Sequence, residues 1–309
     1  MTRSSAIPAF LLSFYCHLAV MAGPPAVQPP FDLAAASERA TKGDAEAQYA
    51  VGRAYMKGEG APVDPAQAVS YFKKAAEQGH AKAQANLGAL LINGKGVPVD
   101  LATGKAWLEK SAAQGDTVAQ TSLGWLYYAG IGTDKNIEEG VRWYRKAADA
   151  GQIDAQLRLG DHYMNSKVIE GAPTDFKEAA KYLTMAASTG HAGAQNSLGV
   201  LYEEGKGVEK NLPEAVRLFR AAAEQGEPRG QMNLGRLYDE GKGVEHNPTE
   251  AAYWLSLSVR QEEITAQRLL KDLVASNRIP TDTYTQARQR ADQAATQNPI
   301  LAPKPAGKP

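Results

Sequence analysis

The sequence predicts an all-α protein in which six helix-turn-helix repeats stack into a solenoid, with capping helices at both ends. A glutamine returns 36, 36, 36, 39 and 36 residues apart, at Gln48, Gln84, Gln120, Gln156, Gln195 and Gln231. A glycine follows each glutamine by four residues, and a second pattern closes the units, as in residues 74–79 and 110–115. Self-similarity at this period is typical of repeat architectures, whose units bury their apolar faces only by stacking.

The first half of each repeat predicts an amphipathic helix. In the first unit Ala47, Val51 and Tyr55 form an apolar stripe at helical spacing. Gly52 interrupts this stripe, although glycine costs about 1 kcal/mol of helix propensity relative to alanine. We therefore expect Gly52 to let the partner helix approach closely. Gly58 then ends the helix in the left-handed conformation that other residues avoid.

The second half of each repeat predicts another amphipathic helix. In the first unit it begins at Asp64 and Pro65, an N-cap residue followed by proline at the first helical position. It is expected to bury Ala68 and Phe72 before Gly79 ends it. Residues 44–263 are assigned to the six repeats, residues 31–43 to an N-terminal capping helix, residues 264–297 to C-terminal capping helices, and residues 298–309 to a disordered tail.

The amino terminus predicts an export signal over residues 1–22, followed by a proline-rich spacer over residues 23–30. Arg3 precedes an apolar run from Ala6 to Val20, which is shorter than the roughly 20 residues that a membrane-spanning helix needs. Small residues favour cleavage before Gly23; an uncleaved membrane anchor is the alternative. Cleavage would remove Cys16, the single cysteine, and a cysteine-free chain suits an oxidising compartment.

One consensus carries a family resemblance. The pattern Ala-x-Ala-Gln-x-x-Leu-Gly-x-x-Tyr-x-x-Gly-x-Gly-Val, present in residues 192–208, resembles the Sel-one-like repeat family. The resemblance covers residues 44–262 and implies a tetratricopeptide-like, right-handed α/α superhelix that scaffolds proteins or binds peptides. Residues 279–281 and the helix expected after them also resemble the cap of bacterial members. Together with the signal, this implies a periplasmic or secreted protein of the bacterial envelope.

Composition argues against several other classes of function. Lys+Arg and Asp+Glu both count 34, so the chain lacks the basic stripe that binds nucleic acid. A single cysteine excludes an internal disulfide and a thiolate zinc site, and no two histidines stand at metal-binding spacing. We therefore expect no catalytic residue, no metal, no cofactor and no nucleic-acid partner.

Two short motifs invite other interpretations. Gly-Lys-Gly occurs at residues 94–96, 205–207 and 241–243, but these glycines follow helix C-termini, where the dipole disfavours phosphate. Ser70 and Lys73 match the S-x-x-K motif of penicillin-interacting enzymes, but the partner motifs of that chemistry are missing. We interpret the first as helix caps and the second as an exposed helix face.

The concave wall of a solenoid, lined by the first helices, is the expected binding surface. Relative to the repeated glycine, three positions are assigned to it: three before, one after and four after. From these positions we select as candidate binding residues Tyr49, Arg53, Thr121, Trp125, Tyr128, Leu157, Asp161, Met164, Met232 and Arg236. The first four units then offer an apolar strip, and the fifth and sixth offer an acidic end with Glu203 and Asp239.

The role of individual groove residues has open alternatives. Trp125 and Tyr128 either form a hot spot for a peptide, or they pack on the neighbouring helix or cover the longer loop of the fourth unit. The longer loop of the fourth unit, residues 165–172, is either a partner-specific finger or a tolerated insertion. Arg53 and Arg236 are expected to pair with acidic groups of a partner, and Glu203 and Asp239 with basic groups.

The sequence as a whole predicts an exported scaffold or adaptor without catalysis, which binds a protein or an extended peptide segment in its concave groove. It would contact a membrane only through an uncleaved signal. The alternatives are a scaffold associated with an envelope polysaccharide and, resting on Ser70 and Lys73, a β-lactam-binding or cell-wall-active enzyme.

Overall fold

The computed structural model describes residues 31–165 and 175–302, and within these two ranges all regular secondary structure is helical. The predicted all-α class is confirmed. The expected signal and spacer (residues 1–30), most of the longer loop of the fourth unit (residues 166–172) and the last seven residues lie outside the described ranges.

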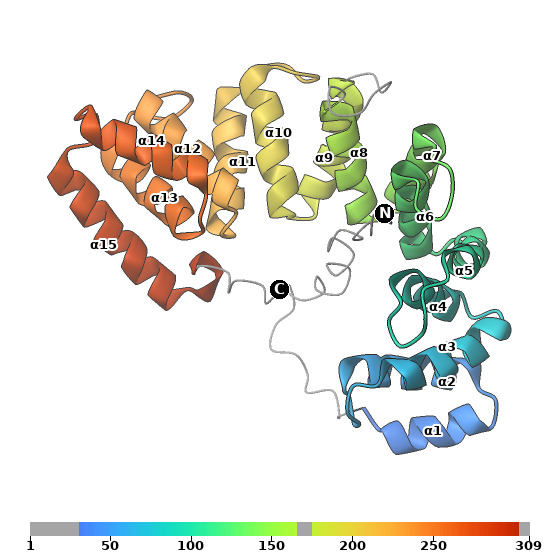
Figure 1. Cartoon of the computed structure of the whole chain (residues 1–309). Helices are drawn as coiled ribbons and strands as arrows, with labels where there is room; N and C mark the ends of the chain where they lie inside the picture. The colour runs from blue at the N-terminus through green and yellow to red at the C-terminus, as the bar shows by residue number, and fades with distance from the viewer. Residues whose placement is uncertain (1–30, 166–174, 303–309) are drawn as a thin grey trace, which may run out of the picture. The chain divides into compact units, whose positions relative to one another are not determined.

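The chain forms two compact units, Met1–Ala147 and Ala148–Pro309. The helices of unit 1 are α1 (Leu33–Thr41), α2 (Ala45–Lys57), α3 (Pro65–Glu77), α4 (Ala81–Asn93), α5 (Leu101–Ala113), α6 (Thr117–Ala129) and α7 (Ile137–Asp149), in which the boundary falls. The helices of unit 2 are α8 (Ile153–Met164), α9 (Phe176–Ser188), α10 (Ala192–Glu204), α11 (Leu212–Glu224), α12 (Pro228–Glu240), α13 (Pro248–Arg260), α14 (Ile264–Ala275), α15 (Thr281–Gln297) and the short 3₁₀ helix η3 (Pro299–Leu301). Helix pairs such as α4 with α5 and α10 with α11 are the repeating hairpins (Figure 1).

The helix ends follow the predicted capping chemistry. Asp64 accepts hydrogen bonds from the backbone N–H groups of Ala66 and Gln67, both at 3.0 Å, and Pro65 begins α3. Gly58 and Gly94 end α2 and α4 with φ of 77° and 65°, the left-handed conformation. The Gly-x-Gly segments are therefore helix C-caps, where the exposed carbonyl end of the dipole repels anions.

The repeated glycine inside each first helix allows close helix packing, as predicted. A Cβ at Gly52 would lie 2.7 Å from the ring of Phe72 on α3, and one at Gly124 would lie 2.6 Å from the ring of Tyr144 on α7. Phe72 and Tyr144 are almost fully buried. The glycine therefore leaves room for a large side chain of the second helix in the same repeat.

The repeated glutamine connects neighbouring helices through hydrogen bonds. Gln48 donates to the carbonyl of Ala40 at 3.1 Å, and Gln84 donates to that of Ala76 at 3.0 Å. A second glutamine at the end of the same repeat then donates to the first: Gln78 bonds Gln48 at 2.8 Å. Gln48 and Gln84 thus join the preceding helix to their own repeats and help to fix the stacking of successive hairpins.

The chain end departs from the predicted disordered tail over residues 298–309. Pro299–Leu301 forms η3, and Asn298 caps it by accepting a hydrogen bond from the N–H of Ile300 at 3.1 Å. Leu301 belongs to the hydrophobic core of unit 2 and is only 8% exposed. The prediction was wrong for residues 298–301 because burial of Leu301 holds this segment against the unit.

Candidate peptide-binding site

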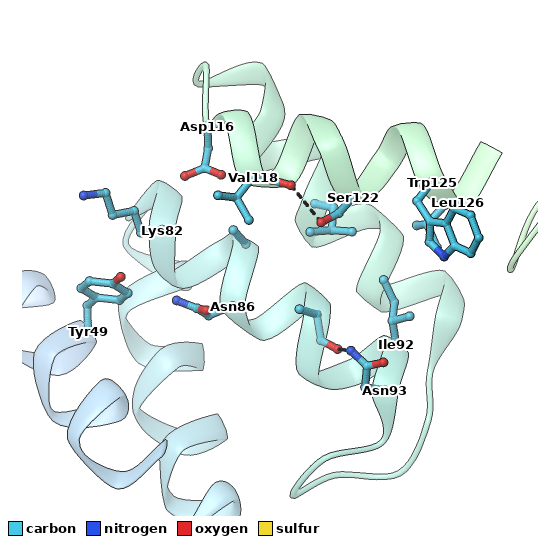
Figure 2. A pocket seen from close by; sticks show the side chains of 13 residues that line it. Tyr49, Lys82, Asn86, Ile92, Asn93, Asp116, Val118, Ser122, Trp125 and Leu126 are labelled. Carbon is cyan, nitrogen blue, oxygen red and sulfur yellow. Dashed lines mark hydrogen bonds between the residues drawn. The ribbon is translucent and has the colours of Figure 1, made fainter. Parts of the chain in front are cut away.

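A cavity of about 390 Å³ lies on the first helices of unit 1 (Figure 2). The side chains that line it come from α2, α4, α5, α6 and the N-cap of α6. They are Tyr49, Lys82, Ala85, Asn86, Ala89, Ile92, Asn93, Leu108, Asp116, Val118, Ser122, Trp125 and Leu126. The cavity therefore spans the first helices of three successive repeats.

The walls of this cavity are largely apolar. Ala85 and Ala89 on α4 are small, whereas Trp125 on α6 presents a wide aromatic ring that is half-buried. Figure 2 shows Trp125 at the same end of the cavity as Ile92. The two alanines and the tryptophan line one cavity, and its space can hold an apolar side chain. Ligand pockets of this volume with apolar linings are typical of specific binding sites.

Polar groups gather at the opposite end, where Tyr49, Lys82 and Asp116 lie (Figure 2). The ring of Tyr49 stacks on that of His80 with centroids 4.6 Å apart, and the guanidinium of Arg53 lies 5.9 Å from the Tyr49 centroid. Burial raises the pKa of Tyr49, so its hydroxyl stays neutral at physiological pH. This end of the cavity offers one cation, one anion and a phenol.

Comparison with known proteins identifies the repeats. The Sel1 repeat model matches six consecutive segments of the chain, residues 45–80, 81–116, 117–152, 153–191, 192–227 and 228–262. The chain belongs to the Sel1 repeat family. No curated protein matches it.

Two solved structures resemble this Sel1 repeat protein. One is c5321, a protective antigen present in uropathogenic Escherichia coli strains that displays an SLR fold; it is 32% identical, with a TM-score of 0.75 over 86% of this chain. This chain spans 56% of the length of c5321. The other is a Sel1 repeat protein from Oxalobacter formigenes, 32% identical with a TM-score of 0.60, where 71% of this chain and 86% of the other are covered. Sel1 repeat proteins are generally non-catalytic scaffolds that mediate protein–protein interaction.

Within unit 1 only some of the predicted groove residues of this Sel1 repeat protein line the cavity. Tyr49 and Trp125 both line the cavity, and Arg53 is exposed beside Tyr49. Thr121 is 1% exposed, and its hydroxyl donates to the carbonyl of Thr117 at 2.8 Å; it is therefore a core residue. Tyr128 does not line the cavity, and its ring centroid lies 6.1 Å from that of Tyr144.

In unit 2 the predicted apolar candidates remain partly accessible. Leu157 and Met164 on α8 are half-buried, and Asp161 between them is exposed. Met232 on α12 packs against the hydrophobic core of the unit.

The predicted charged end in unit 2 is neutralised within the chain. Arg236 forms ion pairs with Glu203 at 2.7 Å and with Glu240 at 3.3 Å. Asp239 is 3% exposed and pairs with Arg278 at 2.6 Å; burial raises the pKa of this carboxyl against the opposing effect of Arg278. The prediction that Arg236, Glu203 and Asp239 pair with charged groups of a partner is therefore wrong. Arg236 already pairs with Glu203, 33 positions away, and Asp239 already pairs with Arg278, 39 positions away.

Several cavity residues were not predicted from the sequence, because the helix face assigned to the groove is rotated toward the core. Asn86 and Ser122 stand two residues before the repeated glycine, and Lys82 and Val118 stand six before it. Positions −6, −2, +1 and +5 follow helical spacings of four, three and four and form one face. That spacing, counted from Trp125, would have found these residues.

The motif of the enzyme alternative lies on an outward helix face. Ser70 and Lys73 are both exposed on α3, and the ammonium of Lys73 lies 3.9 Å from the carboxylate of Glu77. Over residues 31–165 and 175–302, no three His, Cys, Asp or Glu side chains gather where they could hold a metal ion. In the same part of the chain no helix is long and apolar enough to cross a membrane.

Proposed function

We propose that this protein is a scaffold that binds an extended segment of a protein partner along the first helices of its first three repeats. An apolar side chain of that segment occupies the cavity between α4 and α6. The observation that carries the proposal is a cavity lined by two small side chains, Ala85 and Ala89, and by the aromatic ring of Trp125.

The physical basis of the proposed binding is burial. Removing a leucine- or phenylalanine-sized side chain from water contributes about 1.5–3 kcal/mol, and aromatic residues at the centre of a pocket are frequent hot spots. The polar end, with Lys82 and Asp116, then favours a segment whose apolar residue is flanked by charged or polar residues. Both charges lie at one end of the cavity, so they orient the segment.

The protein is also proposed to be exported. The support is the amino-terminal sequence alone: Arg3, the apolar run from Ala6 to Val20, and small residues before Gly23. Amino-terminal sequencing of the protein from the cells that produce it is expected to begin at Gly23; a start at Met1 would contradict cleavage.

A selection from a random peptide library tests the binding proposal. Peptides enriched on residues 23–309 are expected to share an apolar residue next to charged ones. Ala89→Arg fills the cavity and Trp125→Ala removes its wall. Each variant is therefore expected to bind these peptides at least about tenfold more weakly, which corresponds to about 1.4 kcal/mol of binding free energy.

The matched control is Ala106→Arg, the same substitution at an exposed position of α5 that does not line the cavity. Affinity of this variant should equal that of the unmodified protein, and circular dichroism checks that all variants fold. Selection without enrichment, or peptides that bind Ala89→Arg undiminished, would contradict the proposed site.

A further inference from the structure

Helix α4, which crosses the middle of the proposed peptide site, begins at a histidine that accepts a hydrogen bond. His80 is the N-cap of α4, and its Nδ1 accepts from the backbone N–H of Ala83 at 3.1 Å. A ring nitrogen that accepts carries no proton, so the proton of the neutral ring is on Nε2. Nε2 lies 2.9 Å from the carboxylate of Glu46 on α2, to which it donates. The two hydrogen bonds use both ring nitrogens and hold the ring between α2 and the start of α4.

The same ring supports one end of the peptide site. It stacks on the ring of Tyr49, with centroids 4.6 Å apart and planes inclined by 26°. Tyr49 and Lys82, two residues after His80, line the polar end of the cavity (Figure 2). His80 does not line the cavity itself, and its side chain is 15% exposed. The orientation of the His80 ring therefore fixes both Tyr49 and the first turn of α4 without contact to the bound segment.

This N-cap depends on the neutral form of the ring. Histidine is the side chain whose charge changes between pH 5 and 8. In the protonated ring both nitrogens are donors, so Nδ1 no longer accepts from Ala83, and a positive charge at a helix N-terminus opposes the helix dipole. The N-caps of α2 and α6, Asp44 and Asp116, accept through carboxylates at 3.0 and 2.8 Å. Because carboxylates titrate at lower pH than histidine, mild acid acts on the N-cap of α4 alone among these three.

The charges around His80 do not compensate for the lost N-cap. Glu46 attracts a protonated ring, but its side chain is 72% exposed, so water screens the attraction. The other charged side chains in the adjoining turns of α2, α3 and α4 and at the polar end of the cavity are three cations and two anions: Arg53, Lys74, Lys82, Glu77 and Asp116. The sum of these five charges is positive and disfavours a further positive charge.

We propose that His80 is a positioning residue of the peptide site and that its protonation weakens the binding of the segment. The inference rests on the proposed function, because the affinity for the segment is what changes. The neutral ring caps α4 and holds Tyr49 in place. In mild acid the N-cap opens, Tyr49 loses its stacking partner, and the polar end of the cavity no longer orients the segment.

A pH profile of binding tests this. Histidine-free peptides enriched at pH 7.5 in the selection above are titrated onto residues 23–309 at pH 7.5 and at pH 5.5. The unmodified protein is expected to bind them about fivefold more weakly at pH 5.5, the order of effect of losing one helix N-cap. His80→Asn keeps an N-cap acceptor that does not titrate, as Asn211 and Asn247 are in unit 2. Its affinity is therefore expected to be the same at both pH values.

His191→Asn is the matched control. His191 caps α10 in the same way, with Nδ1 accepting from Ala194 at 3.2 Å, but it belongs to unit 2 and does not line the cavity. This variant should keep the fivefold change of the unmodified protein. A change below about twofold in the unmodified protein, or the same change in His80→Asn, would overturn the inference and leave the peptide site standing. Selection without enrichment would instead contradict the proposed function, and the inference with it.

Nuclear magnetic resonance of the ring gives a second readout that needs no peptide. At pH 7.5 the ¹⁵N spectrum is expected to show Nδ1 of His80 without a proton. On acidification the amide signal of Ala83 should follow the protonation of His80, whereas that of Ala119, which Asp116 caps, should not. A proton on Nδ1 at pH 7.5, or an Ala83 amide that ignores the titration, would overturn the inference whatever the peptides do.

Discussion

At the scale of single residues, the repeated glycine has a steric function that outweighs its poor helix propensity. The Cβ of an alanine at position 124 would lie 2.6 Å from Tyr144 Cδ1 and 2.7 Å from Cε1, and Tyr144 is 2% exposed. Gly193 also lies in a first helix, but a Cβ there would meet only the imidazole of His191, at 3.3 Å. Alanine substitutions at these two glycines therefore distinguish the effect of helix propensity on stability from the effect of core packing.

Gly124→Ala is expected to lower the free energy of unfolding by about 1–3 kcal/mol, because a methyl group forced into a packed core displaces the Tyr144 ring. Gly193→Ala is expected to be neutral or to add up to about 1 kcal/mol, since alanine restricts the unfolded chain. Urea unfolding followed by circular dichroism measures both. A Gly124→Ala protein as stable as the unmodified one would show that the core accepts the methyl group.

At the scale of elements, the glutamine pairs join successive hairpins, and one repeat of unit 2 lacks such a pair. Gln261 donates to Gln231 at 3.0 Å, and Gln225 donates to Gln195 at 2.8 Å. The fourth repeat has Thr189 at the corresponding helix end, and the Oε1 of Gln156 is buried without a partner among the described residues. Thr189 has φ −82° and ψ 0°, close to the −85° and 8° of Gln225, so the backbone already suits a glutamine.

Thr189→Gln is therefore expected to raise the free energy of unfolding by about 0.5–1.5 kcal/mol, the net value of a hydrogen bond that satisfies a buried acceptor. The reciprocal variant, Gln261→Thr, is expected to have a free energy of unfolding about 1–3 kcal/mol lower, because it leaves the fully buried Gln231 without its hydrogen-bond donor. Denaturant unfolding of both variants checks this. If neither substitution changes stability, the glutamine pairs do not hold the hairpins together.

Most of the elements, but less of the candidate site, could be predicted from the sequence. The period, the Asp64 cap and the left-handed Gly58 are local signals, so the helices follow from them. The cavity depends on which helix face meets the next repeat, and a choice rotated by one residue exchanged Ser122 for the buried Thr121. Ion pairs such as Arg236 with Glu203, 33 residues apart, depend on stacking geometry and carry no local signal.

At the scale of the whole molecule, helices within each unit pack mainly on their neighbours along the chain, as α4 does on α3 and α5 in unit 1 and α11 does on α10 and α12 in unit 2. Stability in such an architecture is a sum of local and nearest-neighbour contributions. The proposed peptide site depends on α2, α4 and α6, whereas the C-terminal cap, α14 and α15, depends on the packing of α15 against α13. Damage to the cap should therefore leave the peptide site intact.

Ala291→Glu tests this independence. Ala287, Ala291 and Ala295 form a buried stripe on α15 at spacings of four, and an unpaired carboxylate at the fully buried Ala291 costs several kcal/mol. Amide hydrogen exchange is expected to accelerate at least about tenfold in α13 and α15, while α2 to α6 keep their protection. Gln293→Glu, at an exposed position of the same helix, should change neither region. Exchange that accelerates equally in α2 to α6 would mean that the repeats unfold as one cooperative body, so the cap and the peptide site would share a single stability.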